Sequence, residues 1–155
     1  MASIYIYSPS STIIDKKAFS RGLARLRHLG HEVILDPDAR ASFLRFAGDD
    51  ATRLRAIERA ATSGADMAMV SRGGYGLTRL LPHLPYDTLH QATLRGTQFV
   101  GFSDFTALQA AAYANKKTVT WAGPSVGADF GYCDPKSHVP DDIMEACFDD
   151  LVQQQ

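Results

Sequence analysis

The sequence is short of the features that mark membrane-bound, secreted and nucleic-acid-binding proteins. No apolar run approaches the ~20 residues that cross a bilayer, and the amino terminus, MASIYIYSPSS, lacks the basic segment and long apolar stretch of a secretory signal. Basic and acidic side chains number 16 and 17, so there is no basic excess to attract nucleic acid. We therefore expect a cytoplasmic protein that has neither a nucleic-acid nor a membrane partner.

Cysteines and nucleotide-binding motifs are scarce as well. The two cysteines, Cys133 and Cys147, are far from any CxxC spacing, which predicts free thiols in a reducing compartment. Neither GxGxxG nor a GKS or GKT sequence occurs in the chain. A flavodoxin-like domain whose Gly-rich turn binds phosphate is therefore the least favoured interpretation.

What the chain does have is a regular alternation of strands and helices. Its 155 residues, 45% of them hydrophobic and 21% charged, fit one globular domain over residues 1–155. Apolar, β-rich runs predict strands at 4–7, 32–35, 66–70, 97–100 and 118–121. Helical patterns occur at 16–29, 49–63, 77–81, 86–94, from 105 onward and at 141–152, residues 43–48 are ambiguous, and 127–140 is a predicted loop. This order predicts an α/β fold of flavodoxin-like type, a mostly parallel sheet with helices on both faces.

The stretch at residues 97–112, TQFVGFSDFTALQAAA, carries the clearest functional signal. A buried strand turns sharply into a helix and Ser103 stands at the turn, which is the geometry of a nucleophile elbow. Gly101 allows the tight turn, whereas Phe105 occupies the place where the usual elbow has a second glycine. The alternative is that Ser103 or Asp104 simply caps the helix.

Four loops follow predicted strands, at residues 8–10, 72–76, 101–104 and 123–125. Ligands of open α/β sheets bind at the carboxyl ends of the strands, so we expect these loops to converge there. A serine nucleophile needs backbone N–H donors for the oxyanion that develops during acyl transfer. We expect one donor from Asp104 and a second from Gly73 or Gly74, because glycines allow close backbone approach.

Arg72 and Tyr75, in the same Gly-rich loop, are candidate substrate-binding residues. The guanidinium of Arg72 can pair with a substrate carboxylate through two hydrogen bonds. It can equally stay solvated or pair with a nearby Asp.

A general base for the elbow serine is not evident among the five histidines. His28 and His31 flank the end of the first predicted helix, at the wrong end of the sheet. His83 and His90 lie in helical segments, where we expect them to face solvent, and His138 lies in the late loop without a predicted position. The sequence therefore predicts an elbow without its catalytic partners.

Taken together, these motifs resemble the LD-carboxypeptidase family of serine peptidases, which includes muramoyltetrapeptide carboxypeptidases and microcin C self-immunity proteins. The resemblance covers nearly the whole chain in family order. It rests on SPS at 8–10, SRGGYG at 71–76, RLL at 79–81, YD at 86–87, GFSDFTAL at 101–108 and AGP at 122–124. The most specific part is the pair of RGGYG and GFSD, about thirty residues apart. The family usually has His before Gly-Pro, where this chain has Ala122.

The resemblance implies that Ser103 is the nucleophile of a carboxypeptidase that hydrolyses the L,D-peptide bond to a terminal D-amino acid. Murein tetrapeptides, handled during cell-wall recycling, or a microcin-like conjugate would be the substrate, and no metal or cofactor is implied. In the family, the Glu and His of the triad come from a second, carboxyl-terminal domain. The chain thus corresponds to the amino-terminal domain, lacks the second domain as a partner, and is expected to be inactive alone.

A rival interpretation is a non-catalytic α/β module that binds a peptide or carboxylate through the same loops. The loop aromatics bear on it, because a surface that meets a partner is usually more apolar than free surface. We expect several of Tyr75, Phe130 and Tyr132 to be exposed, or covered by a second copy of the chain in a homodimer.

Overall fold

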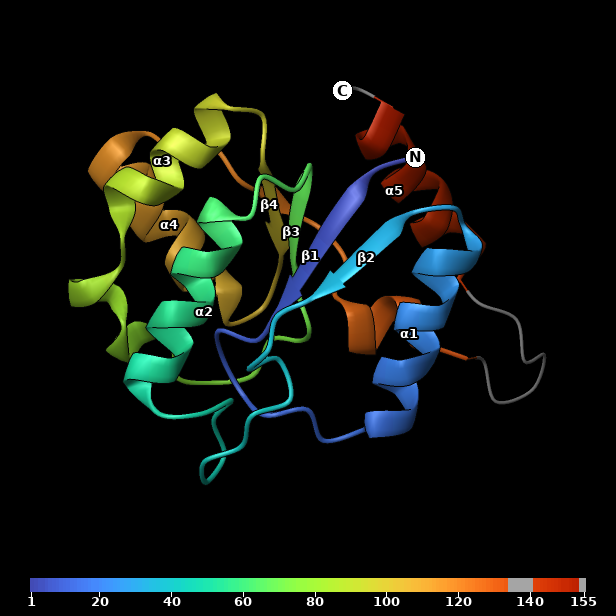
Figure 1. Ribbon diagram of the computed structural model, residues 1–155, viewed down its shortest axis with the longest axis horizontal. Coiled ribbons are helices and arrows are strands. Elements are labelled where there is room, and N and C mark those ends of the chain that lie inside the picture. The colour runs from blue at the N-terminus through green and yellow to red at the C-terminus, as the bar shows by residue number, and fades with distance from the viewer. Residues whose placement is uncertain (134–140, 154–155) are drawn as a thin grey trace.

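The computed structural model describes residues 1–133 and 141–153 and contains a five-stranded sheet flanked by helices (Figure 1). The strands are β1 (Ser3–Tyr7), β2 (Glu32–Leu35), β3 (Met67–Val70), β4 (Gln98–Gly101) and β5 (Trp121–Ala122). The α-helices are α1 (Lys16–His28), α2 (Asp50–Thr62), α3 (Tyr86–Leu94), α4 (Phe105–Lys116) and α5 (Asp142–Gln153). Shorter helical elements are η1 (Leu77–Arg79), η2 (Leu81–His83) and a π-helical turn, η3 (Val126–Phe130).

The sheet has the order β2-β1-β3-β4-β5 and every neighbouring pair is parallel. In the register, Tyr5 lies opposite Ala68, and Ala68 lies opposite Phe99. Because all the strands run in one direction, their carboxyl ends share one edge of the sheet, which is at the bottom of Figure 1. The predicted parallel α/β fold is confirmed.

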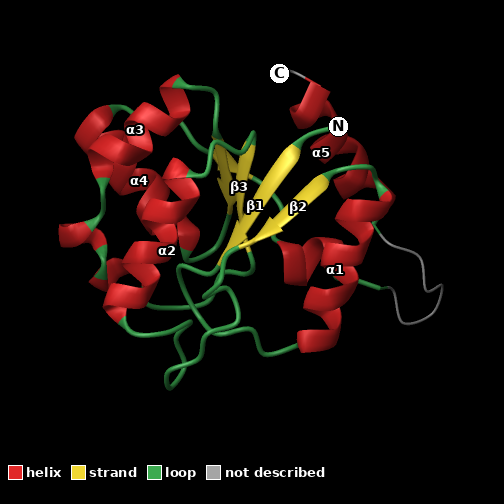
Figure 2. Cartoon of the chain, in the orientation of Figure 1, coloured by secondary structure: helices red, strands yellow, loops and turns green. Residues whose placement is uncertain are grey.

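Alternate residues of the buried strands supply two separate apolar layers. One layer contains Tyr7, Val70 and Phe99 and is covered by α2, α3 and α4. The other contains Ile6 and Met69 and is covered by α1, η3 and α5. Figure 2 shows these two groups of helices on opposite sides of the yellow strands. Because both faces are covered, the central strands are almost entirely apolar, which is the signal that predicted them.

Two segments after α4 differ from the prediction. The predicted strand at 118–121 reduces to Trp121 and Ala122, which pair with Val100 and Gly101. The reason is that Lys117 ends α4 in a left-handed conformation, φ 57°, and the amide of Thr118 still bonds back to the helix. Residues 117–120 therefore form a connection between α4 and β5 and are not part of the sheet.

The predicted loop at 127–140 begins with a helical turn instead. The hydroxyl of Ser125 accepts a hydrogen bond from the amide of Ala128, and the carboxylate of Asp129 accepts one from the amide of Ser125 at 2.7 Å. This turn, η3, packs against α1, where a side chain at Gly22 would collide with the carbonyl of Val126 at 2.2 Å. Within the described ranges 1–133 and 141–153, no helix has the length and apolarity to span a bilayer.

Candidate active site

Ser103 lies at a sharp turn in which β4 ends at Gly101 and α4 begins at Phe105. Its backbone is left-handed, with φ 63°. This conformation costs an L-residue about 1–2 kcal/mol, so the surrounding packing has to enforce it. The strained strand-to-helix turn that the sequence predicts at Ser103 is confirmed.

The departure from the usual elbow sequence has a packing explanation. The ring of Phe105 is fully buried, and a Cβ placed on Gly101 would lie 2.8 Å from it. The same Cβ would lie 2.8 Å from Val70 on β3. Glycine at 101 therefore makes room for a large residue at 105, where the usual elbow has a second glycine.

The helix-capping alternative is wrong, because α4 begins without a side-chain cap from Asp104. The carboxylate of Asp104 instead accepts a hydrogen bond from the amide of Leu77, at 3.0 Å. Leu77 begins η1, directly after the Gly-rich loop, so Asp104 ties the elbow to that loop. Ser103 is exposed, and its hydroxyl forms no hydrogen bond with the described residues, 1–133 and 141–153.

The Gly-rich loop at 72–76 meets the elbow through Gly73. A Cβ added at Gly73 would lie 2.7 Å from Cβ and 3.0 Å from Oγ of Ser103. Only glycine allows this approach, so the expected contact between the two loops is confirmed at Gly73.

Gly74 is in contact with Ser11, from the loop after β1. An added Cβ at Gly74 would lie 2.3 Å from Oγ of Ser11, and that hydroxyl accepts a hydrogen bond from the amide of Tyr75 at 2.9 Å. The predicted convergence of the strand-end loops extends further, since Oγ of Ser8 and Oγ of Ser71 lie 2.6 Å apart. Of the two candidate glycines, Gly73 is the one whose added Cβ would meet the elbow serine.

Unused amide donors remain where the two loops meet. The N–H groups of Gly73, Gly74 and Asp104 donate to no acceptor within the part of the chain that the structure describes. By contrast, the neighbouring amides of Tyr75 and Leu77 are occupied by side chains. The unused amides of the two loops thus include the three that the sequence proposes as donors to an oxyanion.

Arg72 is half-buried and donates to the carbonyl of Thr12 at 3.2 Å. Across the described residues it forms no ion pair, so the alternative of pairing with a nearby Asp is wrong. Its side chain lines a cavity of about 220 Å³ together with Ile13, Asp15 and Gly127. Arg72 is therefore available to an anionic group of a ligand.

Histidines do not contact Ser103 in the described ranges, and only one is deeply buried. His31 is 7% exposed, accepts the amide of Ala2 at Nδ1 and meets the ring of Phe148 edge-on at 5.7 Å. Burial lowers the pKa of His31. This position is at the amino ends of the strands, as expected.

The other described histidines, His28, His83 and His90, form no hydrogen bond with the elbow serine. His28 ends α1 and is exposed, and His83 is exposed as predicted. His90 differs from the prediction, because it is half-buried with Nδ1 3.2 Å from the hydroxyl of Thr118. His138 lies outside the described residues.

The aromatic side chains around the site are partly exposed. Tyr75 is 58% and Tyr132 46% exposed, which confirms that several of the three loop aromatics are exposed, whereas Phe130 is buried against Phe148. Phe102 and Trp121 line a mostly apolar cavity of about 500 Å³ between the loop at 122–124 and α5. Ser103, the neighbour of Phe102, is exposed and does not line this cavity.

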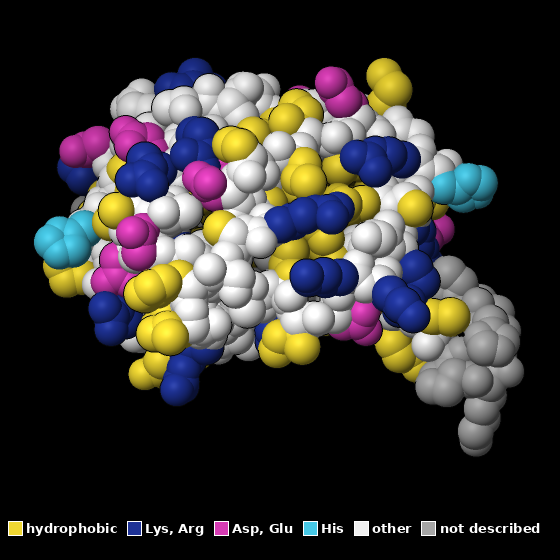
Figure 3. All heavy atoms as spheres, turned by 60° about the horizontal axis from the view of Figure 1, so that its bottom comes forward, with side chains coloured by type: hydrophobic (Ala, Val, Ile, Leu, Met, Phe, Trp, Pro, Cys, Tyr) yellow, Lys and Arg dark blue, Asp and Glu magenta, His cyan; other side chains and the backbone are white. Residues whose placement is uncertain are grey.

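The face at which the strands end is rich in cations (Figure 3). Lys and Arg side chains, in dark blue, stretch across the middle of this face among apolar ones. Described residues contain no group of three or more His, Cys, Asp or Glu arranged to hold a metal ion. Cationic side chains at this edge of the sheet can attract an anionic group of a ligand.

Three contributors to the site were not predicted: Ser11, the carboxylate of Asp104, and Arg53 of α2. Arg53 is fully buried and donates to the carbonyl of Gly76 at 3.1 Å. The sequence signals for the first two were present, since Ser11 continues the polar run after β1 and Asp104 follows the elbow serine. Arg53 gave no signal, because an arginine in an amphipathic helix normally faces solvent.

Comparison with known proteins gives a consistent result. Residues 4–123 match the model of the LD-carboxypeptidase N-terminal domain. The Streptomyces coelicolor protein named "Putative carboxypeptidase SCO6489" is 32% identical over 134 residues, which are 83% of this chain and 42% of that protein.

Two solved structures show the same architecture. Microcin C7 self-immunity protein MccF, in complex with aspartyl sulfamoyl adenosine, superposes with a TM-score of 0.84 at 26% identity, over 96% of this chain and 43% of that one. Muramoyltetrapeptide carboxypeptidase from Oxalobacter formigenes gives a TM-score of 0.80 at 32% identity, over 96% of this chain and 47% of that one. The chain thus spans less than half the length of these relatives.

Proposed function

This chain belongs to the LD-carboxypeptidase family, and we propose that it is the nucleophile-bearing domain of a serine carboxypeptidase. The proposed reaction is hydrolysis of the L,D-peptide bond to a terminal D-amino acid of a murein tetrapeptide. A cytoplasmic role in cell-wall recycling is part of the same proposal, and the muramoyltetrapeptide carboxypeptidase among the similar structures supports it.

The observation that carries this proposal is the conformation of Ser103. Backbone strain of about 1–3 kcal/mol at a single residue persists only when the surroundings enforce it, and it clusters at active sites. Here the left-handed φ of 63° leaves the hydroxyl exposed and unpaired among the described residues, next to Gly73. A hydroxyl in that position is suited to attack a carbonyl carbon.

The proposed oxyanion hole consists of the amide of Asp104 and that of Gly73 or Gly74. Preorganised donors of this kind act on charge that appears only in the transition state, and removing one costs about 10²–10³ in rate. Arg72 would bind a carboxylate of the peptide, and the exposed ring of Tyr75 would pack against its chain. Loss of the D-amino acid would then leave an acyl-enzyme on Ser103 for water to hydrolyse.

A general base is the remaining requirement, and we propose that it comes from a second domain. The family resemblance assigns the Glu and His of the triad to such a domain, and the chain spans only 42–47% of its relatives. The exposed aromatics Tyr75, Phe102 and Trp121 are the proposed contact surface, for that domain or for a second copy of this chain.

Release of D-alanine from a murein tetrapeptide tests the proposal. The 155-residue chain is expected to show no turnover alone, and turnover when fused to the second half of the Oxalobacter formigenes enzyme. Ser103→Ala in the fusion should reduce turnover at least about 10³-fold, whereas the exposed Ser20→Ala should not. Turnover that survives Ser103→Ala would refute the assignment of the nucleophile.

A second candidate function is a non-catalytic module that binds a peptide carboxylate. One reason is Ala122, which stands where the family usually has a histidine. The other is Arg72, whose guanidinium forms no ion pair with any described residue. Calorimetric titration with the tetrapeptide separates the two. Tight binding that Arg72→Met removes and Ser103→Ala leaves intact, without turnover by the fusion, would favour the binding module.

A further inference from the structure

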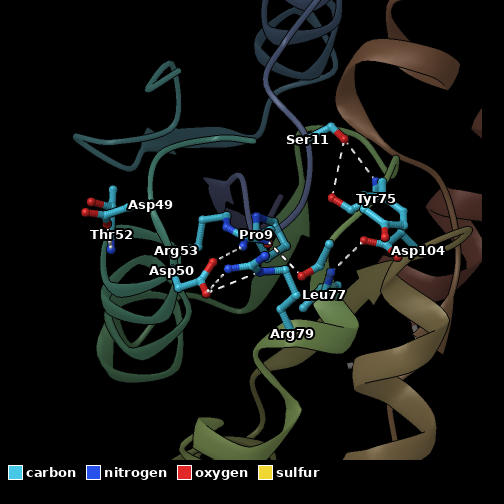
Figure 4. A network of polar contacts seen from close by, with 11 residues as sticks. Pro9, Ser11, Asp49, Asp50, Thr52, Arg53, Tyr75, Leu77, Arg79 and Asp104 are labelled. Atoms are coloured by element: carbon cyan, nitrogen blue, oxygen red, sulfur yellow. Dashed lines mark hydrogen bonds and ion pairs between the residues drawn. The ribbon is translucent and has the colours of Figure 1, made fainter. Parts of the chain in front are cut away.

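Arg53 is the most deeply buried charged side chain near the proposed site. It has no exposed surface, although it belongs to α2, whose outer face meets solvent. Figure 4 shows its guanidinium at the centre of a polar network between α2, the loop after β1 and the Gly-rich loop.

Two of its contacts are to backbone carbonyls of different strand-end loops. Nη1 of Arg53 donates to the carbonyl of Pro9 at 3.2 Å and to that of Gly76 at 3.1 Å. One planar group therefore links the loop after β1 to the end of the Gly-rich loop. Gly76 has φ 113°, and an added Cβ there would lie 3.1 Å from the same Nη1, so only glycine presents its carbonyl in this way.

The guanidinium is held from its other sides. Nη2 donates to the carboxylate of Asp50 at 2.6 Å, and the guanidinium carbon lies 4.8 Å from the ring centre of Phe46. Asp50 is 42% exposed and also accepts from Arg79, and hydrogen bonds from Arg79 and Arg53 lower its pKa. Nε of Arg53 is buried and has no hydrogen-bond partner among the described residues.

This arrangement is poorly explained by stability alone. A buried cation with a half-exposed counterion and an unpaired donor carries a desolvation penalty, and apolar replacements of buried ion pairs are often neutral or stabilising. What the guanidinium provides instead is a fixed position for the two carbonyls, which an apolar side chain could not supply.

The Gly-rich loop is thereby anchored at both ends. At its start, Ser71 bonds to the carbonyl of Tyr7 through its amide and contacts the hydroxyl of Ser8. At its end, Arg53 holds the carbonyl of Gly76. The unused amides of Gly73 and Gly74 lie between these anchors, in a loop that the Tyr75 amide also ties to the hydroxyl of Ser11. Rotation of their peptide planes would change where these amides point.

We propose that Arg53 is a positioning residue, which fixes the Gly76 carbonyl and so holds the amides of Gly73 and Gly74 toward the hydroxyl of Ser103. The inference rests on the proposed function, because it assigns those amides to an oxyanion. It adds a residue of α2 that touches neither the substrate nor Ser103.

Amide ¹⁵N relaxation of the isolated chain tests the inference without any substrate. In the parent chain, Gly73 and Gly74 are expected to have rigid order parameters of about 0.85, and in Arg53→Met values below about 0.6. The amide of Val100 in β4 should remain rigid. Arg55→Met is the matched control, because it makes the same change at an exposed position of the same helix.

Arg53→Lys is the second variant. If Arg53→Met does not fold, Arg53→Lys tests whether Arg53 keeps Gly73 and Gly74 rigid. It keeps the positive charge but loses the planar fork, so intermediate order parameters are expected at Gly73 and Gly74. A purely structural role would lower the melting temperature and leave these order parameters in the folded state unchanged. Rigid Gly73 and Gly74 in a folded Arg53 variant, or flexible ones in the parent, would overturn the inference.

Activity of the fusion protein supplies an independent measurement. Arg53→Lys should lower kcat about 10–100-fold while KM stays within about twofold, because an oxyanion contact acts only in the transition state. If the fusion shows no turnover, the proposed function fails while the relaxation result still judges Arg53. An unchanged kcat in an active fusion would overturn the role of Arg53 and leave the proposed function intact.

Discussion

Two of the arginines of helix α2, Arg53 and Arg59, form opposite kinds of ion pair. At Arg53 the cation is fully buried and its partner Asp50 is 42% exposed. At Arg59 the cation is 32% exposed and its partner Asp36 is fully buried. The two sites share a helix and a residue type, so their difference shows what each pair contributes.

The Arg59 pair is closed on itself. Both carboxylate oxygens of Asp36 accept from Arg59 at 2.8 Å, and Oδ2 also accepts from the hydroxyl of Tyr5 at 2.6 Å. Nη2 of Arg59 also donates a hydrogen bond to the carboxylate of Asp38, at 2.7 Å. This network joins β1, α2 and the turn after β2 through side chains whose hydrogen bonds end within the network.

The Arg53 pair is open by comparison, because its guanidinium reaches backbone carbonyls of loops that border Ser103. The comparison suggests that the Asp36 network serves stability, whereas the Arg53 network serves the position of the Gly-rich loop. Variants of the two networks and of the loops that they join test this division.

Asp36→Ala should have the largest effect on stability, a loss of about 3 kcal/mol, because it removes the acceptor of the buried Tyr5 hydroxyl and leaves Arg59 with Asp38 alone. Urea denaturation measures this loss. Asp38→Ala, at a 37% exposed carboxylate, is the control and should cost less than about 1 kcal/mol. If Asp36→Ala also shifts the amide resonances of Gly73 and Gly74, the proposed division between the two networks is wrong.

Gly73→Ala should destabilise the fold by about 2 kcal/mol through overpacking, because the new Cβ would lie 2.7 Å from that of Ser103. It should also reduce D-alanine release by the fusion about 10²-fold, since it displaces the reacting hydroxyl. Gly64→Ala is the matched control, with φ 73° and no atom within 4 Å of an added Cβ. It should cost about 1 kcal/mol and leave turnover unchanged, and equal turnover of the two variants would contradict the contact.

Asp104→Ala should cost about 1 kcal/mol, because it removes the acceptor of the Leu77 amide. Asp104→Asn should restore most of the loss, since its amide oxygen can accept the same hydrogen bond. Denaturation and the Leu77 amide shift report the two effects. An Asn variant as unstable as the Ala variant would show that the charge, and not the hydrogen bond, joins the elbow to the loop.

Tyr5 gives the smallest and most specific prediction. Burial and the hydrogen bond to Asp36 raise its pKa from 10 to about 12. Between these values the unfolded chain loses the phenolic proton while the folded chain keeps it, so stability falls as pH rises through this window. Tyr5→Phe should make the pH dependence shallower between pH 10 and 12, and Tyr113→Phe, at an exposed ring, should not. Identical curves for Tyr5→Phe and the parent would contradict the closed network.

Much of the fold follows from local sequence. The strands β1, β2, β3 and β4 were predicted to within one residue, because each is a short apolar run bounded by polar or glycine residues. The strand predicted at 118–121 was wrong for residues 118–120. The left-handed conformation of Lys117 displaces these residues from the sheet, and no local sequence pattern predicts that conformation. The π-helical turn at η3 was missed because its glycine and aspartate are typical of loops.

The site was predictable in part, and the division has a physical cause. The strain at Ser103 and the contact with Gly73 follow from a motif whose spacing fixes the local backbone. The contact of Gly74 with Ser11 and the burial of Arg53 depend on residues that are distant in the sequence. Arg53, for example, bonds to Pro9 and Gly76, which are 44 and 23 positions away from it. Such contacts exist only once the sheet has brought the loops together.

The most direct test of the account is the structure of the fusion protein with a phosphonate analogue of the tetrapeptide. With an aryl ester of the phosphonate, we predict that Oγ of Ser103 displaces the aryloxide and bonds to phosphorus, with one phosphonyl oxygen 2.7–3.1 Å from the amide nitrogens of Asp104 and of Gly73 or Gly74. An adduct on another residue, or a phosphonyl oxygen directed away from these amides, would contradict the claim that the elbow and the Gly-rich loop form one catalytic site.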